Sequence, residues 1–188
     1  MANGVKANVT KKAIEGSLRK LLLEKPLDEI TVKDLVEDCG IARQTFYYHF
    51  QDIYAVVEWR FQNVTQELLE QTESMGRKEA IELLIKMMRE NKSLLINTYR
   101  AFDRAYIERY LSRWIKPHLS RIVREQAKNY RIEPGAVEFI EDIYVFILVN
   151  VLLNWVDRGM VSGMVERLDY FYILLEHGMD DAMRHFSR

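Results

Sequence analysis

Residues 31–50 constrain the fold of this chain more than any other stretch, because they predict two short helices joined by a tight turn. Thr31 is a favourable N-cap residue, and Asp34, three residues later, makes a near capping box with it. Gly40 is the residue type expected where a helix ends in a left-handed conformation. The first of the two helices has its apolar positions on one face, at Val32, Leu35, Val36 and Cys39. The pattern therefore predicts a helix-turn-helix unit.

The second short helix predicts a surface for binding rather than for packing. Phe46 and Phe50, four residues apart, supply its buried stripe, and Ile41 fills the turn. The other side chains are mostly hydrogen-bonding groups, none of them acidic, and a protein core could bury few of them: Arg43, Gln44, Thr45, Tyr47, Tyr48 and His49. Such a face is typical of a recognition helix that enters the major groove of DNA. A tyrosine-rich helix that contacts another protein, with no DNA role, is the alternative.

On DNA, these side chains would divide between base edges and the backbone. Arg43 can pair with guanine and Gln44 with adenine, and each such bidentate pair is worth ~1–3 kcal/mol of discrimination. The hydroxyls, rings and imidazole that follow suit phosphate oxygens or, for a ring, a thymine methyl. Lys33 and the N-terminal end of the helix capped by Thr31 would add backbone contacts. The predicted DNA-binding set is Thr31, Lys33, Arg43, Gln44, Thr45, Tyr47, Tyr48 and His49.

In three motifs the chain resembles the DNA-binding domain of the TetR family of bacterial transcription regulators: Thr31-Val-x-Asp-Leu, Cys39-Gly-Ile and Thr45-Phe-Tyr-Tyr-His-Phe. The resemblance covers about the first third of the chain and implies that Tyr47 and His49 clamp DNA phosphates. Ile53 departs from the family, which often has a phosphate-binding lysine there, so that contact is not expected. In residues 47–54 and 89–92 the chain is similar to the subgroup that activates dihydroxyacetone kinase operons.

Charge excludes proteins that coat nucleic acid through a broad positive field. The 188-residue chain has a formal net charge of −1, and residues 1–60 hold equal numbers of basic and acidic side chains. Positive charge is instead local: lysines gather in residues 1–14, Arg43 lies in residues 41–51, and neither stretch contains an acidic residue. Affinity for DNA should then depend on dimerisation and on a few well-placed contacts.

The cysteine count and the hydropathy of the chain indicate in which cellular compartment the protein is expected. A single cysteine excludes an internal disulfide and fits a reducing environment, and no signal peptide is visible. The most apolar stretch, residues 143–156, carries no charge but is shorter than the ~20 residues needed to cross a bilayer. We therefore expect a cytoplasmic protein with no membrane partner, and a buried helix over residues 143–156.

Helical periodicity recurs along the chain and no stretch alternates as a strand would, so the expected fold is all-α. Besides the two short helices, helices are expected over residues 10–25, 52–72, 79–89, 93–102, 104–130, 134–158 and 165–185. Pro117, inside one of these, predicts a kink or a break. We expect three parts: a flexible arm over residues 1–8, a three-helix helix-turn-helix DNA-binding domain over 9–55, and a helical effector-binding and dimerisation domain over 56–188.

Aromatic and polar-tipped residues in the C-terminal half are candidates for an effector site. Most of them recur at intervals of four, which places them along one slowly drifting helix stripe. They could line an apolar cavity in which a few hydroxyls and one imidazole fix a small molecule. A plain hydrophobic core is the alternative. The candidate set is Tyr99, Phe102, Tyr106, Tyr110, Trp114, His118 and Tyr144.

The last two expected helices carry more apolar residues than one domain's core requires. Two such helices from each of two chains could form a four-helix interface, which the family resemblance also implies. Packing within one chain is the alternative. The predicted interface residues are Phe146, Ile147, Trp155, Phe171 and Leu175.

These patterns predict a homodimeric, ligand-responsive transcription regulator that binds double-stranded operator DNA. Repression in the absence of effector is the default, and activation, with a partner protein in place of a small effector, is the runner-up. We expect no enzyme, because no Walker loop, glycine-rich dinucleotide motif or His-Glu-x-x-His motif is present. No cofactor or metal is expected either, since the acids and histidines of residues 176–185 suit a solvated helix end.

Overall fold

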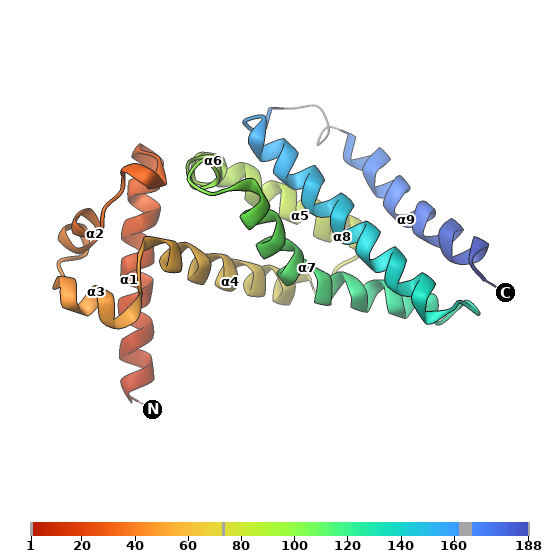
Figure 1. The fold of residues 1–188 in the computed structure, drawn as a ribbon, viewed down its shortest axis with the longest axis horizontal. Coiled ribbons are helices and arrows are strands. Elements are labelled where there is room, and N and C mark those ends of the chain that lie inside the picture. Colours follow the sequence, from red (N-terminus) through yellow and green to blue (C-terminus); the bar gives the residue numbers. More distant parts are fainter. Residues whose placement is uncertain (1, 73, 162–166, 188) are drawn as a thin grey trace. The chain divides into compact units, whose positions relative to one another are not determined.

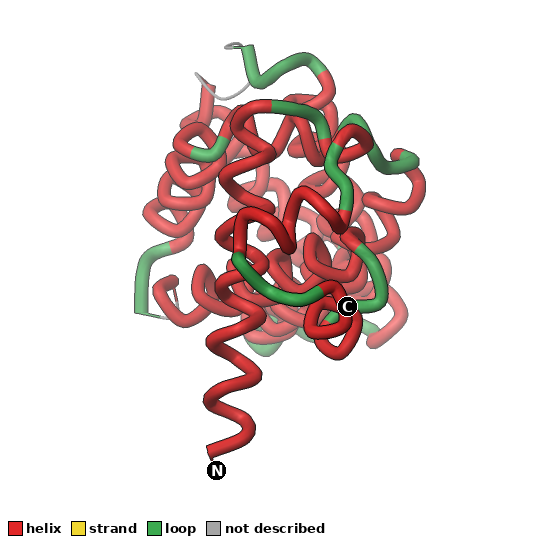
Figure 2. Tube along the Cα trace, turned by 90° about the vertical axis from the view of Figure 1, so that its left-hand side faces the viewer, coloured by secondary structure: helices red, strands yellow, loops and turns green. Residues whose placement is uncertain are grey.

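The computed structural model describes residues 2–72, 74–161 and 167–187. Over these residues the chain is helical, and no strand occurs beyond an isolated bridge between Ile132 and Ser187. Figure 2 shows how little of the described chain lies outside helices. The all-α fold that the periodicity predicted is therefore confirmed. The helices form two compact units, Met1–Ala101 and Phe102–Arg188.

The first unit is built around its first helix. Its elements are α1 (Ala2–Glu24), a 3-10 turn (Leu27–Glu29), α2 (Val32–Cys39), α3 (Arg43–His49), α4 (Ile53–Thr72), α5 (Arg77–Glu90) and α6 (Lys92–Tyr99). Helices α2, α3, α4 and α6 all contact α1 (Figure 1). The buried face of α1 carries Ile14, Leu18 and Leu22 at intervals of four. The side-chain amide of Asn97 on α6 donates to the Leu22 carbonyl at 2.8 Å, which ties α6 to the C-terminal end of α1.

The start of the first helix differs from the one expected. Helix α1 begins at Ala2, so residues 2–8 are helical where the sequence predicted an arm. No proline interrupts this stretch, and extending an existing helix costs far less than nucleating one. The first compact unit extends to Ala101, because α4 and α6 pack with α1; the functional boundary expected near residue 55 stays a prediction.

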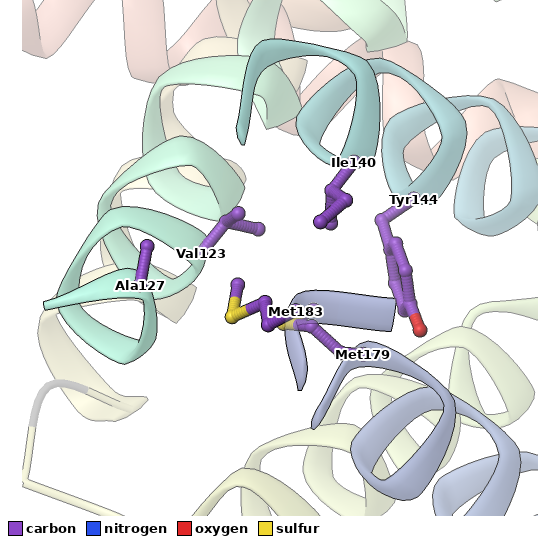
Figure 3. Close-up of a cluster of buried hydrophobic side chains, with 6 residues drawn as sticks. All are labelled: Val123, Ala127, Ile140, Tyr144, Met179 and Met183. Atoms are coloured by element: carbon purple, nitrogen blue, oxygen red, sulfur yellow. The ribbon is translucent and has the colours of Figure 1, made fainter. Parts of the chain in front are cut away.

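The second unit contains α7 (Arg104–Ala127), α8 (Pro134–Asp157) and α9 (Leu168–His185). All three helices contribute to a buried cluster, shown in Figure 3, of Val123, Ala127, Ile140, Tyr144, Met179 and Met183. Helix α7 runs through Pro117 without interruption, so the break that the sequence allowed there does not occur. The start expected for the last helix, near residue 165, lies outside the described residues. No helix of the described ranges is long and apolar enough to span a bilayer.

A buried carboxylate joins α7 to α8. Glu141 is 1% exposed and accepts hydrogen bonds from the Ser120 hydroxyl at 2.7 Å and from Arg124 Nε at 2.6 Å. The bond from Arg124 holds the pKa of Glu141 below its usual value, although burial acts in the opposite direction. Lys116 and Asp142 form a second, more exposed pair between the same helices, at 2.6 Å. The buried charge is tolerated because both of its oxygens are bonded.

Candidate nucleic-acid interface

Local hydrogen bonds fix the turn between α2 and α3. At the start of α2, the Thr31 hydroxyl accepts from the Asp34 N–H at 3.2 Å, and the Asp34 carboxylate accepts from the Thr31 N–H at 2.9 Å. This is the capping box that the sequence predicted. At the end of α2, Gly40 is left-handed, with φ 65° and ψ 34°, and the Ile41 N–H donates to the Val36 carbonyl at 3.0 Å. The chain therefore enters α3 in a defined direction.

Two phenylalanines anchor one side of α3. Phe46 is fully buried, Phe50 is 5% exposed, and their ring centroids are 6.2 Å apart. The ring of Trp59, on α4, lies 6.1 Å from that of Phe50. Because these rings pack beneath α3, the opposite face of the helix points away from the core of the unit.

The predicted DNA-binding side chains lie on that opposite face or at its edges. Tyr48 is 80% exposed and Tyr47 is 49% exposed. The other exposed members of the set are Thr31, Lys33, Arg43 and Gln44, while Thr45 and His49 are half-buried. The structure thus gathers the predicted groups around α3 and the N-terminal end of α2, where their donors and rings remain accessible.

Arg43 and Tyr47 contact each other, although the sequence patterns did not predict this pair. The Arg43 guanidinium donates to the Tyr47 hydroxyl at 3.3 Å, and its carbon lies 5.7 Å from the centre of the Tyr47 ring. The two residues are four apart on one helix, so their spacing alone could have suggested the contact. It holds the guanidinium along α3 beside the ring, and couples a candidate base-reading group to a candidate phosphate-binding group.

The acidic residues of α2 are each paired with a lysine. The pairs are Asp34 with Lys25 at 3.0 Å, Asp38 with Lys20, and Glu37 with Lys33 at 3.7 Å. The Thr31 N–H chiefly lowers the pKa of Asp34, and the bond from Lys20 lowers the pKa of Asp38. Asp34 and Asp38 therefore favour the ionised form, and their charge is offset by the paired lysines. Lys33, a predicted backbone contact, shares its charge with Glu37 in an exposed pair that stabilises little.

The aromatic row predicted in the C-terminal half forms a stack that begins at Phe102, just before α7, and continues along α7. The ring centroids of Phe102 and Tyr106 are 5.6 Å apart with 10° between their planes, and those of Tyr106 and Tyr110 are 6.4 Å apart with 18°. Trp114 continues the row 6.2 Å beyond Tyr110. Tyr106 is 37% exposed and the other three are half-buried. The stack is therefore a ridge with access to solvent.

The other three candidates for an effector site have different settings. Tyr144 belongs to the buried cluster of Figure 3, where burial raises its pKa, which fits the core alternative for this residue. His118 is half-buried on α7, and burial together with Arg121 lowers its pKa. Tyr99 lies on α6, in the first unit. A shallow depression on α7 is lined by other residues: Arg113, Lys116, Pro117, Ser120, Arg121 and Arg124.

The predicted interface residues of α8 and α9 differ in how exposed they are. Phe146 is 58% exposed, whereas Trp155 is 4% exposed and therefore packs within its own chain. Ile147, Phe171 and Leu175 are half-buried, and Leu175 packs against the core cluster. Further large apolar side chains of α8 and α9, not predicted as interface residues, are also exposed: Phe139, Ile143, Tyr170, Ile173 and Leu174.

Groups suited to metal or thiol chemistry are not assembled in the described part of the chain. No three His, Cys, Asp or Glu side chains lie together there as a metal site requires. The Cys39 thiol donates to the Ala13 carbonyl at 3.5 Å, and burial raises its pKa, so it has little thiolate character.

Two family models match the chain. Residues 17–58 match a model of bacterial regulatory proteins of the tetR family, and residues 77–177 match a transcriptional regulator C-terminal region. The HTH-type dhaKLM operon transcriptional activator DhaS of Lactococcus lactis subsp. lactis (strain IL1403) is 26% identical over 128 residues, which are 68% of this chain and 67% of that protein.

Two solved structures share the fold. The dihydroxyacetone kinase operon activator DhaS superimposes with a TM-score of 0.72 at 21% identity, over 96% of this chain and 99% of that one. A TetR transcriptional regulator from Streptococcus agalactiae 2603V superimposes with a TM-score of 0.60 at 18% identity, over 100% of this chain and 99% of that one.

Proposed function

This chain belongs to the tetR family of bacterial regulatory proteins, and we propose that it is a homodimeric repressor that releases its operator DNA when an effector binds the C-terminal half. It is a DNA-binding transcription regulator and not an enzyme, as its family membership shows. A protein-binding module without a DNA role is therefore set aside. The observation that carries the proposal is the exposed, acid-free face of α3 above the buried Phe46 and Phe50.

On the operator, α3 would lie in the major groove with its N-terminal residues at the base edges. Arg43 would then pair with guanine and Gln44 with adenine. The groups that would bind phosphate oxygens, or a thymine methyl in the case of the rings, are Thr45, Tyr47, Tyr48 and His49. Thr31 and Lys33 would reach the backbone from the N-terminal end of α2.

A dimer would supply the second reading helix. The exposed apolar side chains of α8 and α9 are the surface we propose for pairing; Phe146 belongs to it, and Trp155 is left out because it is buried within its own chain. Patches of this kind on a soluble protein are typical of subunit contacts. Two half-sites about one helical turn, or ~34 Å, apart would match a symmetric pair of recognition helices.

The functional division would follow the family: residues 9–55 bind DNA, and residues 56–188 bind the effector and dimerise. The stacked ridge from Phe102 to Trp114 is the part of the predicted effector set that remains accessible to an aromatic or apolar small molecule. Allosteric coupling of ~1–3 kcal/mol would change operator affinity about 5- to 150-fold.

Activation is a second candidate, favoured by one observation. The 26% identical relative is named as a transcriptional activator of the dhaKLM operon. An activator of this fold could respond to a partner protein instead of a small effector. Deleting the gene would separate the two signs of control: transcripts of the adjacent genes rise if the protein represses them and fall if it activates them.

Fluorescence anisotropy tests DNA binding itself. The probes are a duplex from the DNA upstream of this chain's own gene and a scrambled duplex of the same composition. We expect saturable, salt-sensitive binding to the first, lost in Arg43→Ala and Tyr47→Ala and kept in the control Leu23→Ala, with similar melting temperatures for all. If the α3 variants unfold instead, or if wild-type protein does not distinguish the duplexes, the proposal is wrong.

A further inference from the structure

We infer that Lys11 of α1 binds a DNA phosphate beside the C-terminal end of α3, an inference that rests on the proposed function. The Lys11 ammonium lies 5.5 Å from the centre of the Phe50 ring. Phe50 directly follows His49, the last residue of α3. Lys11 thus brings a cation from a different helix to the edge of the α3 surface.

The position of Lys11 is fixed from below. The Phe50 ring is 5% exposed and packs against the rings of Phe46 and Trp59. This packing holds the ring in place beneath the Lys11 ammonium. Lys11 itself is half-buried, while its neighbour Lys12 is exposed. The side chain therefore loses less conformational freedom on binding a phosphate than a fully solvated lysine would.

Lys11 has no carboxylate partner among the described side chains, because the nearest acid along α1 is bound elsewhere. Glu15, one helical turn along α1, is the acid best placed for an ion pair with it. The Glu15 carboxylate instead binds the guanidinium of Arg60, on α4, and both groups are only 18% exposed. The pair with Arg60 therefore removes the local competitor for the Lys11 charge.

Three other lysines near the helix-turn-helix are paired with acids. Lys20, Lys25 and Lys33 pair with the three carboxylates of α2. No acidic residue occurs in residues 41–51. The carboxylate of the next residue, Asp52, accepts a hydrogen bond from the Ala55 N–H at 2.8 Å. Lys11 therefore leaves a positive charge near the C-terminal end of α3 with no acid beside it, as a contact with a DNA phosphate requires.

The test measures how DNA affinity depends on salt. The variant Lys11→Met keeps an unbranched side chain over Phe50 but removes the charge, and Lys11→Arg restores it. Lys92→Met is the control: it removes one exposed cation from α6, a helix bonded to the opposite end of α1. Each protein is titrated by anisotropy with the upstream duplex and the scrambled duplex at several salt concentrations.

If Lys11 holds a phosphate, Lys11→Met weakens binding to both duplexes by a similar factor, because a backbone contact carries no sequence information. The slope of log affinity against log salt becomes shallower by ~0.9 for each lost contact, hence by about twice that in a dimer. Lys11→Arg restores the slope, and Lys92→Met leaves it unchanged.

Two results would overturn the inference and are distinguishable from each other. Wild-type binding with an unchanged slope in Lys11→Met removes Lys11 from the interface and leaves the proposed function intact. If the wild-type protein binds neither duplex, both the inference about Lys11 and the proposed function are wrong. Unfolding data on each variant show whether a loss reflects the charge, since a charge effect leaves the melting temperature close to that of the wild type.

Discussion

The Arg43 guanidinium donates to the Tyr47 hydroxyl at 3.3 Å, so two side chains proposed to do different work on DNA are already in contact without it. Holding the guanidinium against a ring reduces the rotamer freedom that it must lose on binding a base. The arrangement predicts that the two residues act on affinity as a unit.

A double-mutant cycle measures that coupling. Tyr47→Phe removes the hydroxyl and keeps the ring, and we expect its effect on operator affinity to shrink once Arg43 is replaced by alanine. A coupling of ~0.5–1 kcal/mol is expected for two residues in contact. Tyr48→Phe is the matched control, and its effect should add to that of Arg43→Ala. Equal coupling in the two cycles would show that the hydroxyl contact has no role on DNA.

Gly40 predicts a stability loss that comes from the backbone alone. A Cβ added there meets nothing within 4 Å, but the positive φ of 65° disfavours any L side chain. Gly40→Ala should therefore destabilise the protein by ~1–2 kcal/mol in urea unfolding. Gly16→Ala is the opposite case: Gly16 lies within α1, has equal space and an ordinary φ, and should give a gain of ~0.5–1 kcal/mol. A loss of similar size in both would show that packing, and not φ, sets the cost.

Glu141 predicts a pH-dependent contribution to stability. Its pKa is lowered in the folded protein, so its contribution is present above the pKa of the unfolded chain and is lost as pH falls through the folded value. Glu141→Gln should therefore flatten the decline of unfolding free energy in acid, measured by urea titration between about pH 7 and pH 3. An unchanged pH profile would assign the acid dependence to other carboxylates.

The two cations that join α7 to α8, Arg124 and Lys116, should contribute differently to the free energy of unfolding. Arg124→Met removes both hydrogen bonds that Arg124 donates to the buried Glu141 carboxylate, which should cost ~1–3 kcal/mol. Lys116→Met breaks the exposed pair with Asp142 and should cost less than ~1 kcal/mol. Equal losses in urea unfolding would show that burial of the carboxylate does not decide the cost of removing its partner.

The exposed face of α8 and α9 predicts the oligomeric state. Light scattering at micromolar concentration should give twice the 22.3 kDa chain mass for the wild type. A charge at an exposed apolar position of this surface, in Phe146→Glu or Leu174→Glu, should give the mass of one chain. Leu23→Glu, at an exposed position in the first unit, should remain a dimer. A wild-type monomer would remove the basis for a symmetric operator.

Local hydrogen bonding explains which parts of this fold could be predicted from the sequence. Thr31, Asp34 and Gly40 define the ends of α2 through bonds that span only a few residues, so their residue types alone were sufficient. Phe46 and Phe50 likewise fix which face of α3 is buried, and the accessible face follows by elimination. Most long helices occur where the periodicity predicts them, within a few residues at each end.

The orientation of α8 could not be predicted in the same way. Residues 143–156 carry no charge, so the helix has no polar side to show which of its faces meets solvent. The sequence assigns Trp155, Tyr144 and Phe146 alike to candidate binding surfaces, but Trp155 and Tyr144 are buried and only Phe146 is exposed. Contacts that join distant residues, such as Arg60 with Glu15, were equally invisible, because they depend on how α4 returns to α1.

The pairing of the α2 acids with lysines has a consequence for how this regulator would search a chromosome. With three of its lysines paired to the acids of α2, a single reading head has fewer cations for DNA phosphates and would leave arbitrary DNA quickly. Long residence would then need both heads to meet matched sequence at once, and the time saved on wrong sites would shorten the search for the right one.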